Sequence, residues 1–99
     1  GKHMNKYELV VILSAKLEDD ARTAALEKVK GYITRYEGTI GEVEEWGKKR
    51  LAYDIAHESE GFYYLINFEG TPETPIGVES QVRIMEPVLR FLIVKKDEE

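Results

Sequence analysis

The sequence predicts an α+β fold in which a four-stranded antiparallel sheet carries two helices on one face. Two observations predict it. Stretches with a two-residue hydrophobic period alternate with stretches of helical period, and they follow the order strand, helix, strand, strand, helix, strand. The length of 99 residues suits a single hydrophobic core. We therefore expect one domain over residues 4–99, after an expression-tag remnant at residues 1–3.

Hydrophobic alternation predicts four strands. Tyr7–Leu13 has β-branched residues on both sides, which is typical of a central strand. Thr39–Tyr53 is rich in charges and contains two glycines typical of bulges, so we expect a long edge strand. After a predicted turn at residues 57–61 (HESEG), Phe62–Phe68 alternates most clearly of all. Leu89–Lys95 is the predicted fourth strand.

Two segments have helical periodicity. Residues 18–36 begin with acidic residues and carry an apolar stripe, and Gly38 is placed for a left-handed cap. Thr74 and Pro75 predict the N-cap and first turn of a shorter helix, in which Gly77 costs about 1 kcal/mol relative to alanine. The complete order is the βαββαβ pattern of ferredoxin-like folds, whose right-handed crossovers place both helices on one face of the sheet.

The strand pattern predicts two apolar sheet faces. The helix-covered face carries the larger apolar load: Leu9, Val11, Phe62, Tyr64, Ile66, Phe68, Phe91 and Ile93. The opposite face carries Val10, Ile12, Tyr63, Leu65, Leu92 and Val94. The sequence predicts no third helix to cover this second face. A contiguous exposed apolar patch more often marks a contact surface than a merely amphipathic sheet.

The composition argues against several classes of protein. A formal charge of −5 argues against nonspecific nucleic-acid binding, which needs an electropositive footprint. The absence of cysteine excludes disulfides, iron–sulfur ligation and a thiol nucleophile. No apolar run reaches the ~18 residues of a membrane span, so we expect a cytoplasmic protein without membrane contact.

The sequence contains no recognisable catalytic or metal-binding constellation. His57 lies in the predicted turn, and the other histidine lies in the predicted tag remnant, so a metal site lacks ligands. Glu42, Glu44 and Glu45 crowd the predicted edge strand, where charges more often prevent pairing with other chains than act in catalysis. We expect no enzyme activity, no metal, no cofactor and no small-molecule substrate.

The segment EGFYYLINF partly matches the signature of RNA-recognition motifs and falls on the matching strand of the same topology. The match breaks at three positions: Glu60 replaces a cation, Tyr63 a small residue and Asn67 an aromatic residue. Moreover, Phe62 and Tyr64 are assigned to the core. Base stacking on this sheet is therefore the weaker interpretation.

The segment GKKRLAYDI places three cations, Lys48, Lys49 and Arg50, near Tyr53 in an acidic protein. Two interpretations are open. The cations either protect an edge strand from pairing or contact phosphates, with Tyr53 available to stack or to hydrogen-bond. Taken alone, the pattern favours the first interpretation, because short charge runs are usually solvent faces.

Four segments carry a resemblance to a known family: KYELVVIL, VEEWGKKRLAYDI, EGFYYLINFE and RIMEPVLRFLIVK. In order and spacing they resemble the bacterial small-subunit (30S) ribosomal protein six family, from Met4 to about Lys96. The resemblance implies a non-enzymatic ribosomal protein that binds the central domain of the small-subunit ribosomal RNA. It also implies a heterodimer with the eighteenth small-subunit protein and a role in platform assembly.

The resemblance implies Lys49 and Arg50 as the first candidates for RNA contact, Lys6 as a second candidate, and Arg90 as a residue near the RNA or the partner. The pattern of the basic cluster itself adds Lys48 and Tyr53 as further candidates for RNA contact. Our face assignment predicts a partner-binding surface made of Val10, Ile12, Trp46, Tyr63, Leu65, Leu92 and Val94. The alternative is a small-molecule regulatory or self-associating domain on the same ferredoxin-like fold, because this fold hosts many functions.

Overall fold

The computed structural model describes residues 4–96, so the predicted tag remnant, residues 1–3, lies outside the described residues. The elements are β1 (Asn5–Ser14), α1 (Asp19–Arg35), β2 (Thr39–Ile55), β3 (Glu58–Gly70), α2 (Thr74–Val82) and β4 (Val88–Lys95). Their order confirms the predicted alternation of strands and helices.

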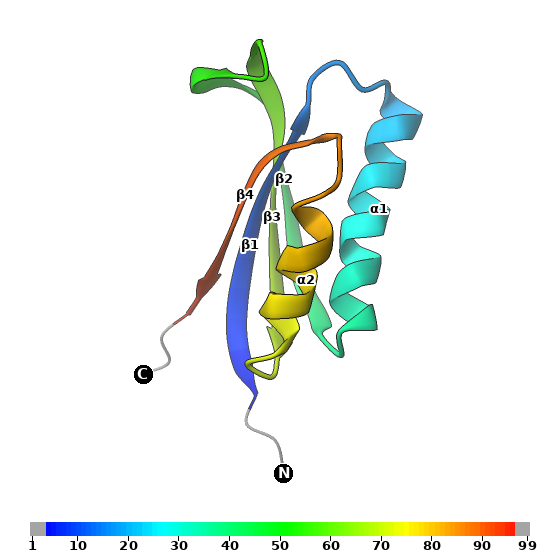
Figure 1. Ribbon diagram of the computed structural model, residues 1–99, viewed down its shortest axis with the longest axis vertical. Coiled ribbons are helices and arrows are strands. Elements are labelled where there is room, and N and C mark those ends of the chain that lie inside the picture. Colours follow the sequence, from blue (N-terminus) through cyan, green and yellow to red (C-terminus); the bar gives the residue numbers. More distant parts are fainter. Residues whose placement is uncertain (1–3, 97–99) are drawn as a thin grey trace.

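The strands form one sheet in the order β2-β3-β1-β4, and every neighbouring pair is antiparallel. Both helices lie on the same side of this sheet (Figure 1). This is the predicted ferredoxin-like arrangement. The first strand is central and the second lies at an edge, as expected.

The core lies between the sheet and the helices. Alternate residues of β1 and β3 are buried against apolar residues of α1 and α2, and Phe91 and Ile93 of β4 pack against the same cluster. The Tyr7 and Phe68 rings stack within it, with centroids 5.3 Å apart. The predicted helix-covered face is therefore confirmed. We call the opposite side of the sheet the open face.

The predicted turn at residues 57–61 is wrong, because β3 already begins at Glu58. The loop consists of Ala56 and His57, whose φ angles of 50° and 65° are the positive values that two-residue hairpins favour. Glu58 is held in place by Ser14, whose hydroxyl donates a 2.8 Å hydrogen bond to its carboxylate. Strand pairing and this tertiary contact override the polar, turn-like composition.

The left-handed residue after α1 is Glu37, with φ 67°, and not Gly38 as predicted. The Gly38 N–H donates to the Ile33 carbonyl at 2.8 Å, and the Glu37 N–H donates to the Thr34 carbonyl at 3.0 Å, which together form a Schellman motif. A Cβ on Gly38 would lie 2.9 Å from the Ile33 oxygen. Glycine is therefore needed at position 38 because the backbone passes close to Ile33, and not because the backbone is left-handed there.

Thr74 is the first residue of α2 and not its N-cap, which is Glu73. The Thr74 side chain is fully buried, and its hydroxyl donates a 2.9 Å hydrogen bond to the Tyr36 carbonyl at the end of α1. A Cβ on Gly77 would overlap the Tyr36 ring. Thr74, the predicted N-cap, and Gly77, the residue predicted to weaken the helix, thus both serve the contact between α2 and the end of α1.

Candidate nucleic-acid and partner interface

The predicted basic cluster lies on the edge strand β2, and Lys48, Lys49 and Arg50 are all exposed. The strand bulges just before them, where the register shifts and Gly47 has a φ of 83°, as its glycine predicted. Lys48 pairs with Phe62, which faces the helix-covered core. Strand alternation therefore places Lys48 and Arg50 on the helix side and Lys49 on the open face.

Lys49 shares the open face with an exposed aromatic residue. Its Nζ lies 5.7 Å from the ring centroid of Trp46, and 43% of Trp46 is exposed. The Trp46 Nε1–H donates a 3.0 Å hydrogen bond to the Glu44 carboxylate. The indole is thus fixed next to a cation, an arrangement that suits contact with a partner chain or with a phosphate backbone.

On the helix side, two cations lie near the Phe62 ring, with the Arg22 guanidinium 4.0 Å and the Lys48 Nζ 6.0 Å from its centroid. Asp19 pairs with Arg22 at 3.0 Å. Burial raises the pKa of the Tyr64 phenol above its ordinary value, although its hydrogen bond with Arg22 opposes part of that rise. Phe62 and Tyr64 belong to the helix-covered side, which leaves them unavailable for base stacking on the open face.

The structure brings Tyr53 and Arg90 together from opposite edges of the sheet. They are 37 residues apart, yet the Arg90 Nη1–H donates a hydrogen bond to the Tyr53 hydroxyl. The contact forms because the end of the β2–β3 hairpin bends away from α1, toward the open face (Figure 1). Pairing between β2 and β3 is interrupted between Arg50 and Ile55, which permits the bend.

The bent hairpin end coincides with a second buried site. Ile12 and Leu51 are only 7% and 8% exposed, although neither belongs to the main core cluster. A Cβ on Gly61 would overlap the Ile12 side chain, so the hairpin backbone closely approaches this residue. Ile12 is therefore covered within the chain itself, unlike the rest of the predicted partner surface. Sequence reasoning missed Leu51, whose only signal is an apolar side chain after three cations.

The rest of the predicted partner surface remains accessible. Leu92 and Val94 are 59% and 44% exposed, whereas Val10, Tyr63 and Leu65 are partly buried. No helix of the described part of the chain covers these residues, since both helices lie on the other side (Figure 1). The open face thus combines an apolar centre with Trp46 and Lys49 on one margin.

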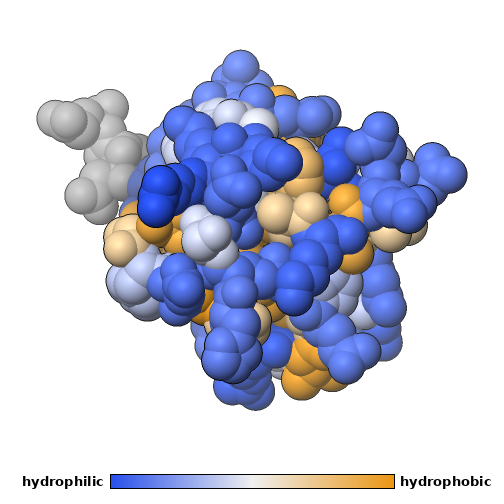
Figure 2. Space-filling view, turned by 90° about the horizontal axis from the view of Figure 1, so that it is seen from above, coloured by the Kyte–Doolittle hydropathy of each residue, from blue (hydrophilic) through white to orange (hydrophobic). Residues whose placement is uncertain are grey.

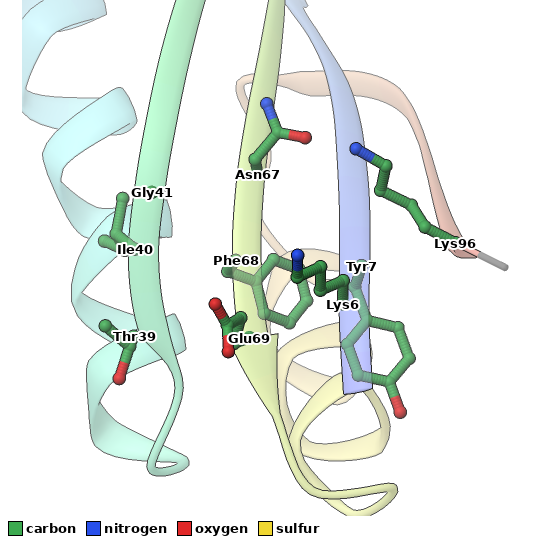
Figure 3. Close-up of a pocket in the computed structure, with 9 residues that line it drawn as sticks. All are labelled: Lys6, Tyr7, Thr39, Ile40, Gly41, Asn67, Phe68, Glu69 and Lys96. Atoms are coloured by element: carbon green, nitrogen blue, oxygen red, sulfur yellow. The ribbon is translucent and has the colours of Figure 1, made fainter. Parts of the chain in front are cut away.

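Lys6 lies at the other end of the sheet. It pairs with Glu69, whereas Lys49 pairs with Gly61. These two partners are eight positions apart along β3, roughly 26 Å at the spacing of an extended strand. Lys6, Asn67 and Lys96 line a cavity of about 270 Å³ there (Figure 3). The structure therefore does not join Lys6 to the basic cluster, and it adds Lys96, which sequence reasoning missed.

Within residues 4–96, no group of three or more histidine, cysteine or carboxylate side chains is arranged to hold a metal ion. His57 is exposed in its turn. None of the helices in this part of the chain is both long and apolar enough to cross a membrane. Viewed from the hairpin end, the surface is mainly hydrophilic with scattered apolar areas (Figure 2). The open face, with its exposed apolar side chains and the pair Trp46 and Lys49, is the candidate interface with RNA and a partner protein.

Comparison with known proteins places this fold and surface in a family. The family model of ribosomal protein S6 matches residues 6–95. The chain is 43% identical to the small ribosomal subunit protein bS6 of Clostridium novyi over 94 residues, which cover 95% of this chain and 99% of that protein. It is 40% identical to bS6 of Moorella thermoacetica, with 97% of this chain and 98% of that protein covered.

A solved structure agrees with these relatives. The crystal structure of 30S ribosomal protein S6 from Thermotoga maritima superposes with a TM-score of 0.90 at 25% sequence identity. The match covers 95% of this chain and 89% of the other. The chain therefore belongs to the ribosomal protein S6 family, and it is a structural, non-enzymatic component of the small subunit of the cytoplasmic bacterial ribosome.

Proposed function

We propose that this protein binds the central domain of the small-subunit ribosomal RNA as a heterodimer with the eighteenth small-subunit protein and thereby helps to assemble the platform. The observation that carries the proposal is the open face. Exposed apolar side chains, Leu92 and Val94, lie on β4 at one edge of it, and the exposed pair Trp46 and Lys49 lies on β2 at the other edge. One surface thus offers both a protein contact and a phosphate contact.

The negative net charge of the protein supports the proposal that it binds RNA together with a basic partner. At a net charge of −5, the chain as a whole repels a polyanion, and its local cations must act at short range. A basic partner seated on the open face would supply the remaining positive charge. It would also bury the apolar side chains that neither α1 nor α2 covers.

Lys49, on the open face, and its neighbour Arg50, on the helix side of the same strand, are the first candidates for contact with the RNA backbone. Arginine offers a planar fork of donors for phosphate, and lysine offers a mobile point charge. Lys48, Arg90 and Tyr53 lie at the same end of the molecule, whereas Lys6 lies at the other end of the sheet. If Lys6 contacts RNA, it does so at a separate phosphate.

A gel-shift titration of a central-domain RNA fragment, with and without the eighteenth small-subunit protein, tests this proposal. We expect binding that depends on the partner and falls with added salt. The double charge reversal Lys49→Glu/Arg50→Glu should weaken it strongly. The matched control Lys28→Glu/Arg83→Glu changes the charge equally at exposed positions outside the open face and should have little effect.

The outcomes separate the interpretations of the cluster. Binding that survives the reversal at Lys49 and Arg50 would make these cations protectors of the edge strand only. A salt-insensitive homodimer that binds no RNA, even with the partner present, would instead favour a self-associating domain. Equal losses in the test and control variants would indicate a nonspecific effect of net charge.

A further inference from the structure

We infer that the cavity beside Arg90 is an anchor pocket that receives one apolar side chain of the partner protein, an inference that rests on the proposed heterodimer. The cavity has a volume of about 270 Å³. We define the anchor pocket by the residues that line it: Val10, Ile12, Arg90, Phe91 and Leu92. This volume lies below the usual range of drug-sized ligand sites, and it suits a single large side chain.

The lining of the pocket is mostly apolar. Val10 and Leu92 face each other across the β1–β4 ladder, and Leu92 is 59% exposed. Ile12, at 7% exposure, forms a buried base. An apolar side chain entering between them would remove Leu92 from water. Such desolvated, well-packed pockets carry a large share of the binding energy of protein interfaces.

Arg90 lines the anchor pocket and is held in a defined orientation. The Tyr53 hydroxyl accepts a hydrogen bond from Arg90, which fixes the guanidinium. A guanidinium has five N–H donors, so several remain for an acceptor oxygen of the partner. The expected ligand is therefore an apolar side chain flanked by a backbone carbonyl or a carboxylate.

The chemistry of the pocket favours a protein segment over RNA. Four of its five lining residues are apolar, and a single arginine supplies the positive charge. The exposed cations Lys48, Lys49 and Arg50 lie on β2, at the opposite edge of the sheet from β4. A phosphate backbone would find more cations there than in the pocket.

The test compares two alanine substitutions on the same face of β4. Both residues are exposed on the open face and belong to the proposed partner surface. Leu92 lines the anchor pocket, whereas Val94 lies outside it and serves as the comparison at the margin of the same face. Isothermal titration of the eighteenth small-subunit protein should give an affinity at least tenfold weaker for Leu92→Ala and less than threefold weaker for Val94→Ala. Tyr53→Phe, which releases Arg90, should weaken binding about threefold.

A second variant keeps the test valid if Leu92→Ala lowers thermal stability. Val10→Phe fills the pocket from a partly exposed position and should also weaken binding at least tenfold. An alanine scan of the partner's apolar residues should reveal one position whose loss is no longer additive with Leu92→Ala.

Each result decides the inference. Equal effects of Leu92→Ala and Val94→Ala, with normal binding by the wild type, would overturn the anchor pocket and leave the heterodimer standing. Absence of wild-type binding would overturn both. If Leu92→Ala instead abolishes a homodimer in sedimentation experiments and leaves partner binding unchanged, the pocket belongs to a second copy and the inference is wrong.

Discussion

Two glycines of the first crossover have opposite physical roles. Gly31 lies in the exposed interior of α1, and a Cβ there would meet nothing within 4 Å. Gly38 lies against Ile33, where a Cβ would be 2.7 Å from the side-chain Cγ2. The first glycine only weakens the helix, whereas the second permits the chain to leave it.

Alanine substitutions should therefore have opposite signs. Gly31→Ala is expected to raise the free energy of unfolding by about 0.5–1 kcal/mol, because alanine restricts the unfolded chain and favours the helix. Gly38→Ala should lower it by about 1–3 kcal/mol through overpacking. Urea denaturation of both variants measures the two changes. Effects of the same sign would contradict this account of the C-terminal turn.

Tyr64 makes stability depend on alkaline pH. Burial raises its pKa in the folded state above the ordinary value of 10.0. The unfolded chain therefore loses this proton first, and the stabilisation that is present below pH 10 is lost as the pH rises through the folded-state pKa. In Tyr64→Phe, the free energy of unfolding should fall less steeply above pH 10 than in the wild type.

Urea titrations at several pH values between about 9 and 11 measure this slope. Tyr53→Phe removes one tyrosine from an exposed position and serves as the control. An unchanged slope in Tyr64→Phe would show that other groups cause the alkaline loss of stability.

At the scale of elements, a hydrogen bond from a buried hydroxyl group joins α2 to the end of α1. The Thr74 hydroxyl donates to the Tyr36 carbonyl, and its side chain is fully buried. Thr74→Val keeps the shape and removes the donor, so it should lower the free energy of unfolding by about 1–3 kcal/mol. Thr34→Val removes an equivalent bond to Gly31 at an exposed site and should change it by less than about 0.5 kcal/mol.

Chemical denaturation of both threonine variants distinguishes a tertiary role from a local one. Equal, small effects would mean that water replaces the Thr74 hydroxyl at the helix–helix contact.

The alternation of β2 divides its cations between two faces, so neighbouring lysines should differ in function. Lys49 shares the open face with Trp46, whereas Lys48 approaches Phe62 on the helix side. In the RNA gel shift with partner, Lys49→Ala is expected to weaken binding about fivefold, as for a lost phosphate contact, and Lys48→Ala less than about twofold. The reverse order would place the RNA on the helix side of the hairpin.

At the scale of the whole molecule, the net charge is −5, but the exposed cations Lys48, Lys49 and Arg50 are consecutive residues of β2. Electrostatic binding to RNA through a few phosphates predicts a measurable salt dependence. If Lys49 and Arg50 each neutralise one phosphate, Lys49→Ala/Arg50→Ala should reduce the slope of log K against log salt concentration by about 1.4–1.8, depending on whether the contacted RNA is single- or double-stranded. Titrations at several salt concentrations measure it, and an unchanged slope would exclude both residues as phosphate contacts.

The sequence by itself determined the order of the elements, the central and edge strands, and the split between a helix-covered and an open face. These features follow from hydrophobic periodicity, which is local. The four resembling segments also pointed correctly to the family. The basic cluster was visible as a run of three cations, but its division between two faces required the register set by the bulge at Gly47.

Only the tertiary structure decided the details that depend on residues far apart in the chain. The hairpin turn moved to Ala56 and His57 because strand pairing prevails over composition. Thr74 serves a neighbouring helix, and Tyr53 meets Arg90 from the other edge of the sheet. Such contacts arise from the bend and packing of whole elements. Sequence spacing does not record that geometry, and the anchor pocket depends on it.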